Sequence, residues 1–225
     1  MVTSAKIKIS IIFAFLILST ATEGAGEKME FGAFAGTSYY LGDINPGKHF
    51  YSLSPAFGGT FKYNFNDHYS LRKSVNYGSI TGDDNDFEND FQQMRGASFQ
   101  SGFYDFTLLL EFNFFPFETT IFKKGFSPYL TGGFSYMFIP EDSYISSSHV
   151  NIPFGGGFKF GISKKITVGA EWLFKKFLSD EIDGVMNFGQ KNDPSLIHNN
   201  DWVSLAGFFI TIKPFEKRGD CPVYW

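Results

Sequence analysis

The sequence predicts an all-β protein, an eight-stranded antiparallel up-and-down transmembrane β-barrel with a filled lumen. Aromatic residues make up 20% of the 225 residues, and 30 of them are Phe. These residues concentrate in segments of about ten residues in which apolar and polar side chains alternate, the pattern of barrel strands that meet lipid. The connections between the segments alternate between short and long, as they do in such barrels.

The clearest segment is TLLLEFNFFPF, residues 107–117. With a period of two residues, it separates into an apolar face and a mixed face. The apolar face carries Leu108, Leu110, Phe112 and Phe114, and the mixed face carries Thr107, Leu109, Glu111 and Asn113. A helix would scatter these residues around its circumference, so the alternation predicts a strand.

The same alternation recurs along the chain. It is strong in residues 55–66, 151–162 and 167–175, and weaker in residues 29–41, 69–81, 127–138 and 202–213. Together with residues 107–117, these segments predict eight strands of about ten residues each.

The polar faces of these segments are rich in Gly and carry few charges, of both signs. A strand face that is exposed to water would carry more Lys and Glu, so we predict that the polar faces line a narrow lumen and the aromatic rows face lipid. The charged residues expected to form ion pairs in the lumen are Glu30, Lys62, Arg72, Asp105, Glu111, Lys159, Glu171 and Lys175. Lys73 falls on the apolar face, where we expect its long side chain to reach the membrane interface.

The short connections, residues 66–68 and 163–165, are expected on the periplasmic side of a bacterial outer membrane, together with both chain termini. Residues 115–126 form a longer connection on that side. Basic and aromatic residues there predict a surface for a partner, although an ordinary solvated rim would look similar. The predicted interface consists of Lys123, Lys124, Lys164, Lys165, Lys217, Arg218, Tyr224 and Trp225.

Two regions are expected in the chain. Residues 1–24 have the layout of a signal peptide that is removed, because Lys6 and Lys8 precede an apolar run at residues 9–18. Residues 25–225 would form an outer-membrane β-barrel domain with a short periplasmic C-terminal tail. The single cysteine, Cys221, cannot form an internal disulfide.

No catalytic chemistry is indicated, so we expect the protein not to be an enzyme and to have no cofactor, metal or small-molecule substrate. The four histidines, His49, His68, His149 and His198, fall in predicted connections without a nucleophile nearby in the sequence. The acidic segment at residues 82–90 could bind calcium weakly, but it lacks the glycine and final glutamate of a helix-loop-helix calcium site. A net charge of -4 and the absence of a basic stripe argue against a nucleic-acid partner.

A resemblance adds to this interpretation. The chain contains, in order, YYLGDINP, PAFGG, YNFN, LRKSVNYGSITGDD, EFNFFPF, PYLTGG, IPFGGGFK, AEW, DEIDGV, NDW and CPVY. This succession resembles the PorG-type outer-membrane β-barrel proteins of the bacteroidete type IX secretion system. The resemblance covers nearly all of the chain after the predicted signal peptide.

The resemblance implies a non-enzymatic subunit of the protein secretion and gliding motility machinery. It also implies partners, namely a periplasmic ring lipoprotein and its ring partner (PorK and PorN type), besides outer-membrane lipid. The family provides no catalytic residues. Two alternatives stay open: a small barrel that acts as a surface adhesin or envelope-stabilising protein and, more distantly, a lipid-modifying enzyme.

Overall fold

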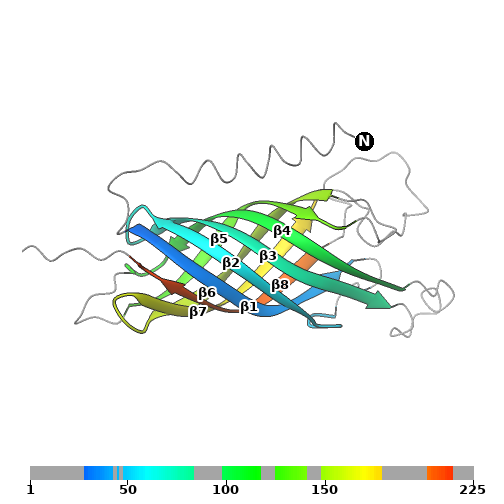
Figure 1. Cartoon of the computed structure of the whole chain (residues 1–225), viewed down its shortest axis with the longest axis horizontal. Coiled ribbons are helices and arrows are strands. Elements are labelled where there is room, and N and C mark those ends of the chain that lie inside the picture. Colours follow the sequence, from blue (N-terminus) through cyan, green and yellow to red (C-terminus); the bar gives the residue numbers. More distant parts are fainter. Residues whose placement is uncertain are drawn as a thin grey trace, which may run out of the picture.

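The computed structural model describes residues 28–42, 45, 48–83, 98–117, 125–140, 148–178 and 202–214. These residues form one closed barrel in which each strand pairs with its neighbours in the sequence and β1 pairs with β8 (Figure 1). The strands are β1 (Met29–Leu41), β2 (Ser54–Asn64), β3 (Tyr69–Asp83), β4 (Ser98–Asn113), β5 (Phe126–Phe138), β6 (Ser148–Gly161), β7 (Ile166–Phe177) and β8 (Trp202–Ile212). The predicted fold class and strand number are confirmed.

Every pair of neighbouring strands is antiparallel, and each pair keeps one register along its whole length. The closing pair runs from Phe31 opposite Ile212 to Leu41 opposite Trp202. Full closure leaves no sheet edge exposed, which removes the unpaired backbone groups of an open sheet. Within the described residues, no helix has the length and apolar character needed to cross a membrane.

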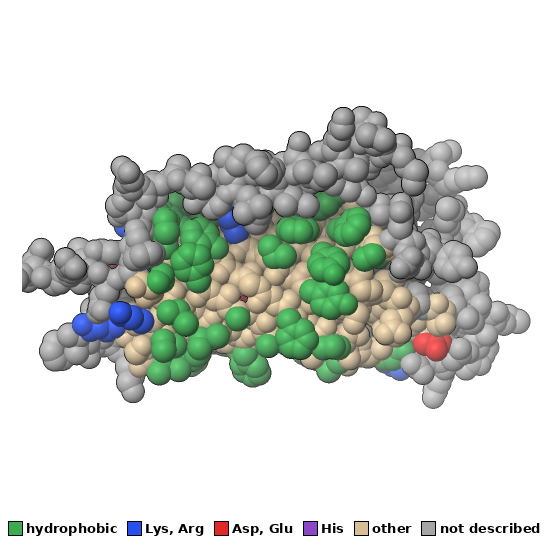
Figure 2. All heavy atoms as spheres, in the orientation of Figure 1, with side chains coloured by type: hydrophobic (Ala, Val, Ile, Leu, Met, Phe, Trp, Pro, Cys, Tyr) green, Lys and Arg blue, Asp and Glu red, His purple; other side chains and the backbone are tan. Residues whose placement is uncertain are grey.

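The two faces of each strand differ in the way the alternation predicts. In β4, Leu110 and Phe112 are exposed on the outer wall, whereas Leu109 and Glu111 are buried inside. Figure 2 shows hydrophobic side chains spread over the visible outer wall, with most of the visible charged side chains near its two ends. Because ion pairs are buried inside while large hydrophobic side chains are exposed on the wall, the polarity of this barrel is the inverse of that of a water-soluble protein.

The lumen is filled by side chains. Ion pairs, described below, occupy part of it, and an apolar cluster occupies another part. The cluster consists of Phe34, Tyr40, Ala56, Ile80, Phe103, Leu109, Tyr129, Met137, Ile139, Leu173, Phe177, Val203, Leu205 and Phe209. A barrel of eight strands has an interior just wide enough for its own side chains, which accounts for this packing.

The connections divide the barrel into two ends. We call the end with residues 65–68, 114–125 and 162–165 the turn end; β1 begins there and β8 finishes there. The opposite end, the loop end, carries the connections at residues 42–53, 84–97, 139–147 and 178–201. The alternation of short and long connections is therefore as predicted, with residues 114–125 as the long exception at the turn end.

His149 was expected in a connection, and this is wrong, because β6 begins at Ser148 and buries His149 against the ring of Phe177. The predicted signal peptide and most of the C-terminal tail lie outside the described residues, which begin at residue 28 and end at residue 214.

Candidate functional site

A charged centre lies inside the barrel around Glu111 of β4, a residue with 0% exposure. Its Oε2 atom is 3.0 Å from Lys62 Nζ and 3.1 Å from Lys159 Nζ. The third cation is Arg72, whose Nε atom is 3.1 Å from Glu111 Oε1, without the geometry of a hydrogen bond. Ser70 donates a further hydrogen bond of 3.1 Å to Oε2. Three strands, β2, β3 and β6, thus direct cations at one carboxylate.

Arg72 extends this centre across the lumen to β7. Its Nη1 atom donates to Glu171 Oε2 at 2.6 Å, and the Tyr129 hydroxyl donates to the same oxygen at 2.9 Å. The exposure of Arg72 is 2%. Taking charges out of water is costly, and the cost is offset only where partners and hydrogen bonds are well placed. The centre therefore stabilises the barrel only as a complete set.

A second charged cluster surrounds Asp105 of β4. Lys175 of β7 pairs with Asp105 Oδ2 and donates to the Thr107 hydroxyl at 3.1 Å. Thr107 and Asn76 donate to Asp105 Oδ2 at 2.5 and 3.2 Å, and Ser135 donates to Oδ1. Four neighbours on β3, β4, β5 and β7 therefore hold this single carboxylate.

Glu30 is joined to a partner that the sequence pattern missed. Its carboxylate is 3.4 Å from Lys213 Nζ and accepts hydrogen bonds from Asn64 at 2.7 Å and Thr211 at 2.8 Å. Lys213 ends the alternating segment 202–213, but it was not among the charged residues expected in the lumen; in the structure it follows the last residue of β8. The eight residues predicted to line the lumen are thus all buried, and each carboxylate among them has a basic partner.

Phe117 is buried at the turn end, beside a cation of the charged centre. Its backbone N–H donates to the Asp67 carbonyl at 3.1 Å, which ties the start of the long connection to the tight turn beside it. Its ring is 8% exposed and lies 5.2 Å from Lys159 Nζ, within the range of a cation–π contact. Nothing in the alternation distinguishes Phe117 from its exposed neighbour Phe115, so this role could not be predicted.

Of the predicted partner surface, only Lys164 and Lys165 belong to the described residues. Both are exposed in the turn between β6 and β7, and the Lys165 carbonyl accepts a hydrogen bond of 2.8 Å from the Lys213 N–H. The remaining members, Lys123, Lys124, Lys217, Arg218, Tyr224 and Trp225, lie outside the described residues.

Lys73 lies on the outer wall by its register, which places it opposite Phe61 and Leu108. The residue is nevertheless only 8% exposed. Among the described residues, no group of three or more His, Cys, Asp and Glu side chains could hold a metal ion.

The geometry limits what this interior can do. Ion pairs and apolar side chains occupy the described lumen, and the buried ring of Phe117 lies beside Lys159 at the turn end. An unfolded or folded polypeptide could pass only if buried charged groups separated, and leaving a buried charge without its partner is costly. Interactions with other molecules are therefore expected at the outer wall and the two ends.

Several solved structures are similar to this chain, among them the following three. Neisserial surface protein A (NspA) is 11% identical, with 83% of this chain and 97% of that chain covered and a TM-score of 0.49. The N-terminal β-barrel domain of OprF from Pseudomonas aeruginosa is 13% identical, with 83% and 98% covered and a TM-score of 0.45. The outer membrane protein OprG from Pseudomonas aeruginosa is 13% identical, with 83% and 97% covered and a TM-score of 0.44.

No curated protein sequence matches the chain. A family model matches residues 7–224, which is nearly the entire sequence, and its description is "Domain of unknown function (DUF6089)". On the strength of that match, the chain belongs to the DUF6089 family.

Proposed function

We propose that this protein is a small barrel of the bacterial outer membrane, with the loop end outside the cell and the turn end and both termini in the periplasm. Its exposed outer wall supports this, since Phe134 is 69% and Phe208 is 73% exposed. A wall of this kind would be a large apolar patch in water, whereas lipid covers it without cost. Short turns on the periplasmic side are the usual arrangement of such barrels.

The single observation that carries the functional proposal is the closed interior. Glu111 with its three cations and Phe117 below them leave no path for a protein cargo. The protein therefore acts through its surfaces and not as a pore. We also propose that it is not an enzyme, because the buried charged groups in the described part of the chain pair with one another inside the barrel.

We further propose that it is a subunit of the type IX secretion and gliding machinery that docks on a periplasmic ring of the PorK and PorN type. The sequence resemblance supports this role, and so does the basic character of the turn end. The described turn end carries the exposed cations Lys28, Lys164 and Lys165 and one exposed carboxylate, Asp67, whereas Lys213 is paired with Glu30. A positive rim that faces the periplasm would attract an acidic partner surface and help to set its orientation.

Co-purification with the ring lipoprotein tests this role. The variant Lys164→Glu with Lys165→Glu reverses two exposed charges in a turn and should leave the barrel folded and heat-modifiable, while recovery of the ring lipoprotein falls at least about tenfold, the equivalent of 1.4 kcal/mol. A matched control is Lys48→Glu, which reverses a lysine at the loop end. The variant Lys123→Glu with Lys124→Glu extends the test to the longer connection.

The opposite outcome would favour the second candidate, a surface adhesin or envelope-stabilising barrel. Equal recovery of the ring lipoprotein with all three variants, together with undiminished secretion, would exclude the turn end as a docking surface. The connections of the loop end would then be the candidate contact region.

A further inference from the structure

An aromatic cluster covers the outer wall at the loop end, where β1, β6, β7 and β8 lie side by side. The ring centroids of Trp172 and Phe174 are 4.9 Å apart, and Phe154 lies 6.0 Å from Phe174 and 5.8 Å from Trp202. The Trp172 indole N–H donates to the hydroxyls of Tyr39 at 3.1 Å and Ser204 at 2.8 Å. Tryptophan and tyrosine at this level are typical of the boundary between hydrocarbon and headgroups.

The connection between β1 and β2 folds back onto this cluster. Phe50 packs 5.3 Å from the Trp172 ring and 5.2 Å from the Tyr39 ring, and His49 Nδ1 is 3.2 Å from the Tyr39 hydroxyl. Phe50 and Ser52 adopt positive φ angles of 60° and 48°, which are unfavourable for residues with a side chain. Strained backbone of this kind persists where surrounding contacts hold it, and it concentrates at binding sites.

A cation completes the cluster. Lys176 follows Trp172 and Phe174 on the outward face of β7, and its Nζ atom lies 5.3 Å from the ring centroid of Trp202. A lysine on the outer wall at the headgroup level can approach an anion without entering hydrocarbon.

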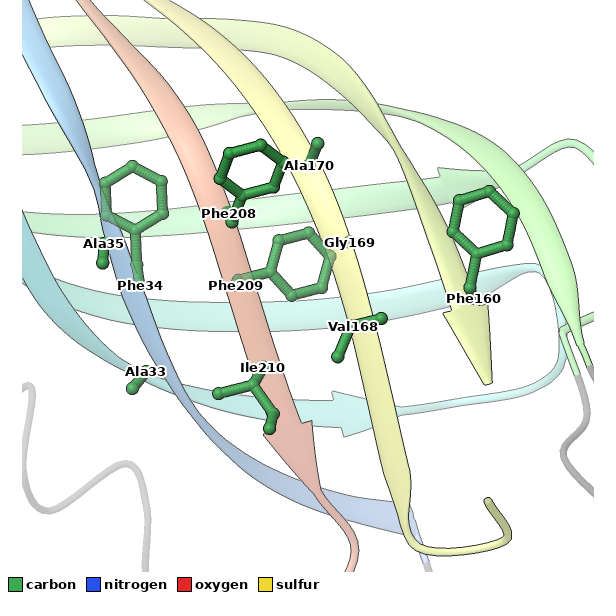
Figure 3. A pocket seen from close by; sticks show the side chains of 10 residues that line it. All are labelled: Ala33, Phe34, Ala35, Phe160, Val168, Gly169, Ala170, Phe208, Phe209 and Ile210. Carbon is green, nitrogen blue, oxygen red and sulfur yellow. The ribbon is translucent and has the colours of Figure 1, made fainter. Parts of the chain in front are cut away.

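An apolar groove of about 740 Å³ begins at the same aromatic residues and runs along the outer wall of β5, β6 and β7. Gly156 and Ala170 form its shallow floor, and Leu130, Phe154, Phe158 and Trp172 are among the side chains that border it. A Cβ atom at Gly156 would lie 2.8 Å from the Tyr129 carbonyl oxygen, so only glycine fits the backbone at this point of the floor. A second groove of about 540 Å³ adjoins it at Ala170 and continues across β8 to β1 (Figure 3).

The dimensions suit one lipid leaflet. Ala170, Trp172, Phe174 and Lys176 are successive outward positions of β7. Six residues of strand span about 20 Å, and the usual strand tilt of about 40° reduces this to roughly 15 Å across the membrane. Half of a hydrocarbon core of about 30 Å is also roughly 15 Å. The groove floor would then lie near the bilayer centre and Lys176 at the headgroups.

We propose that this outer wall is a binding site for a phosphorylated glycolipid of the leaflet on the loop side. One phosphate pairs with Lys176, the sugar ring packs on Trp202 and Trp172, and an acyl chain fills the groove over Gly156 and Ala170. The site rests on the proposed membrane insertion, and it is separate from the turn end, where the ring would dock.

Native mass spectrometry tests the proposal on the barrel released from phosphatidylcholine nanodiscs that contain a small fraction of diphosphoryl lipid A. The wild-type barrel should retain diphosphoryl lipid A in preference to its dephosphorylated form. Lys176→Gln should lose that preference, and Ala170→Leu should lower retention of both forms roughly fivefold, the equivalent of about 1 kcal/mol.

Two control variants should behave as the wild type. Lys165→Gln removes an exposed lysine at the opposite end, and Gly59→Leu adds a leucine to the outer wall of β2, where a Cβ atom would meet nothing within 4 Å. Heat-modifiable mobility in gels reports insertion separately for each variant.

Three results would overturn the proposal. These are equal retention of the two lipid A forms, equal retention by Lys176→Gln and the wild type, and dimers that Ala170→Leu abolishes, which would assign the groove to a second copy of this chain. If an inserted barrel gives any of these three results, the proposed glycolipid site is wrong. The proposed location in the outer membrane would be unaffected. A barrel that fails to insert would overturn both.

Discussion

Glu111 on β4 and Lys159 on β6 form an ion pair of 3.1 Å inside the barrel, although β5 separates their strands in the sheet. The pair therefore reaches across the lumen and ties together elements that share no backbone hydrogen bonds. Lys62 on β2 also pairs with Glu111, with its Nζ atom 3.0 Å from Oε2, although β3 lies between their strands. One carboxylate thus connects distant parts of the barrel wall, which makes Glu111 the residue on which the polar interior depends most.

The first prediction concerns this residue. Glu111→Leu leaves three buried cations without their shared carboxylate, so the free energy of unfolding should fall by about 3–5 kcal/mol. Urea unfolding in detergent or lipid vesicles measures the change. Asp67→Asn, which removes a carboxylate from an exposed turn, should change it by less than about 0.5 kcal/mol. Equal, small effects of the two substitutions would mean that Glu111 is solvated.

The second prediction concerns closure of the turn end. Phe117→Ala removes a buried ring from above Lys159 and should cost about 3 kcal/mol. Phe115→Ala removes a ring that is 53% exposed, two residues earlier in the same connection, and should cost much less. Exchange of the amide protons that line the turn end should also accelerate for Phe117→Ala alone. Identical stability of the two variants would exclude Phe117 as the closing residue.

The third prediction uses two adjacent glycines of β5. A Cβ atom on Gly133 would overlap the backbone carbonyl oxygen of Leu108, whereas one on Gly132 would have its nearest neighbour, the Pro153 carbonyl oxygen, at 3.9 Å. Gly133→Ala should therefore cost about 1–3 kcal/mol by overpacking. Gly132→Ala should be neutral or slightly stabilising, because alanine restricts the unfolded chain. A reversed order in unfolding experiments would contradict the register between β4 and β5.

Much of the fold could be predicted from the sequence because a strand has a strict period of two. In residues 107–117, alternation puts Glu111 and Leu110 on opposite faces, and the glycine-rich, sparsely charged polar faces indicate that Glu111 points inside, where the structure has it. The same reasoning placed all eight predicted lumen residues in the interior. The lengths of the connections followed from the spacing of the alternating segments.

The pairing inside the lumen could not be predicted in the same way. Which cation meets which carboxylate depends on strand tilt and on contacts across the barrel, and a linear pattern does not contain these. Arg72 on β3 pairs with both Glu111 on β4 and Glu171 on β7, although β3 is adjacent only to β4. Lys213 and Phe117 lie beyond the ends of β8 and β4, and although both belong to alternating segments, alternation does not say which groups they contact. The return of His49 and Phe50 onto the outer wall is likewise a tertiary contact.

The central claim is that the outer wall faces lipid, and thiol labelling at Phe208 tests it most directly. Phe208 is 73% exposed, so water should reach a cysteine there readily if the barrel were soluble. With Cys221→Ser in the background, we predict that Phe208→Cys in native membranes reacts with a membrane-soluble maleimide and not with a charged one. Ser163→Cys, in the exposed turn between β6 and β7, should react with both after the cells are permeabilised. Rapid labelling of Phe208→Cys by the charged reagent in intact membranes would contradict the account.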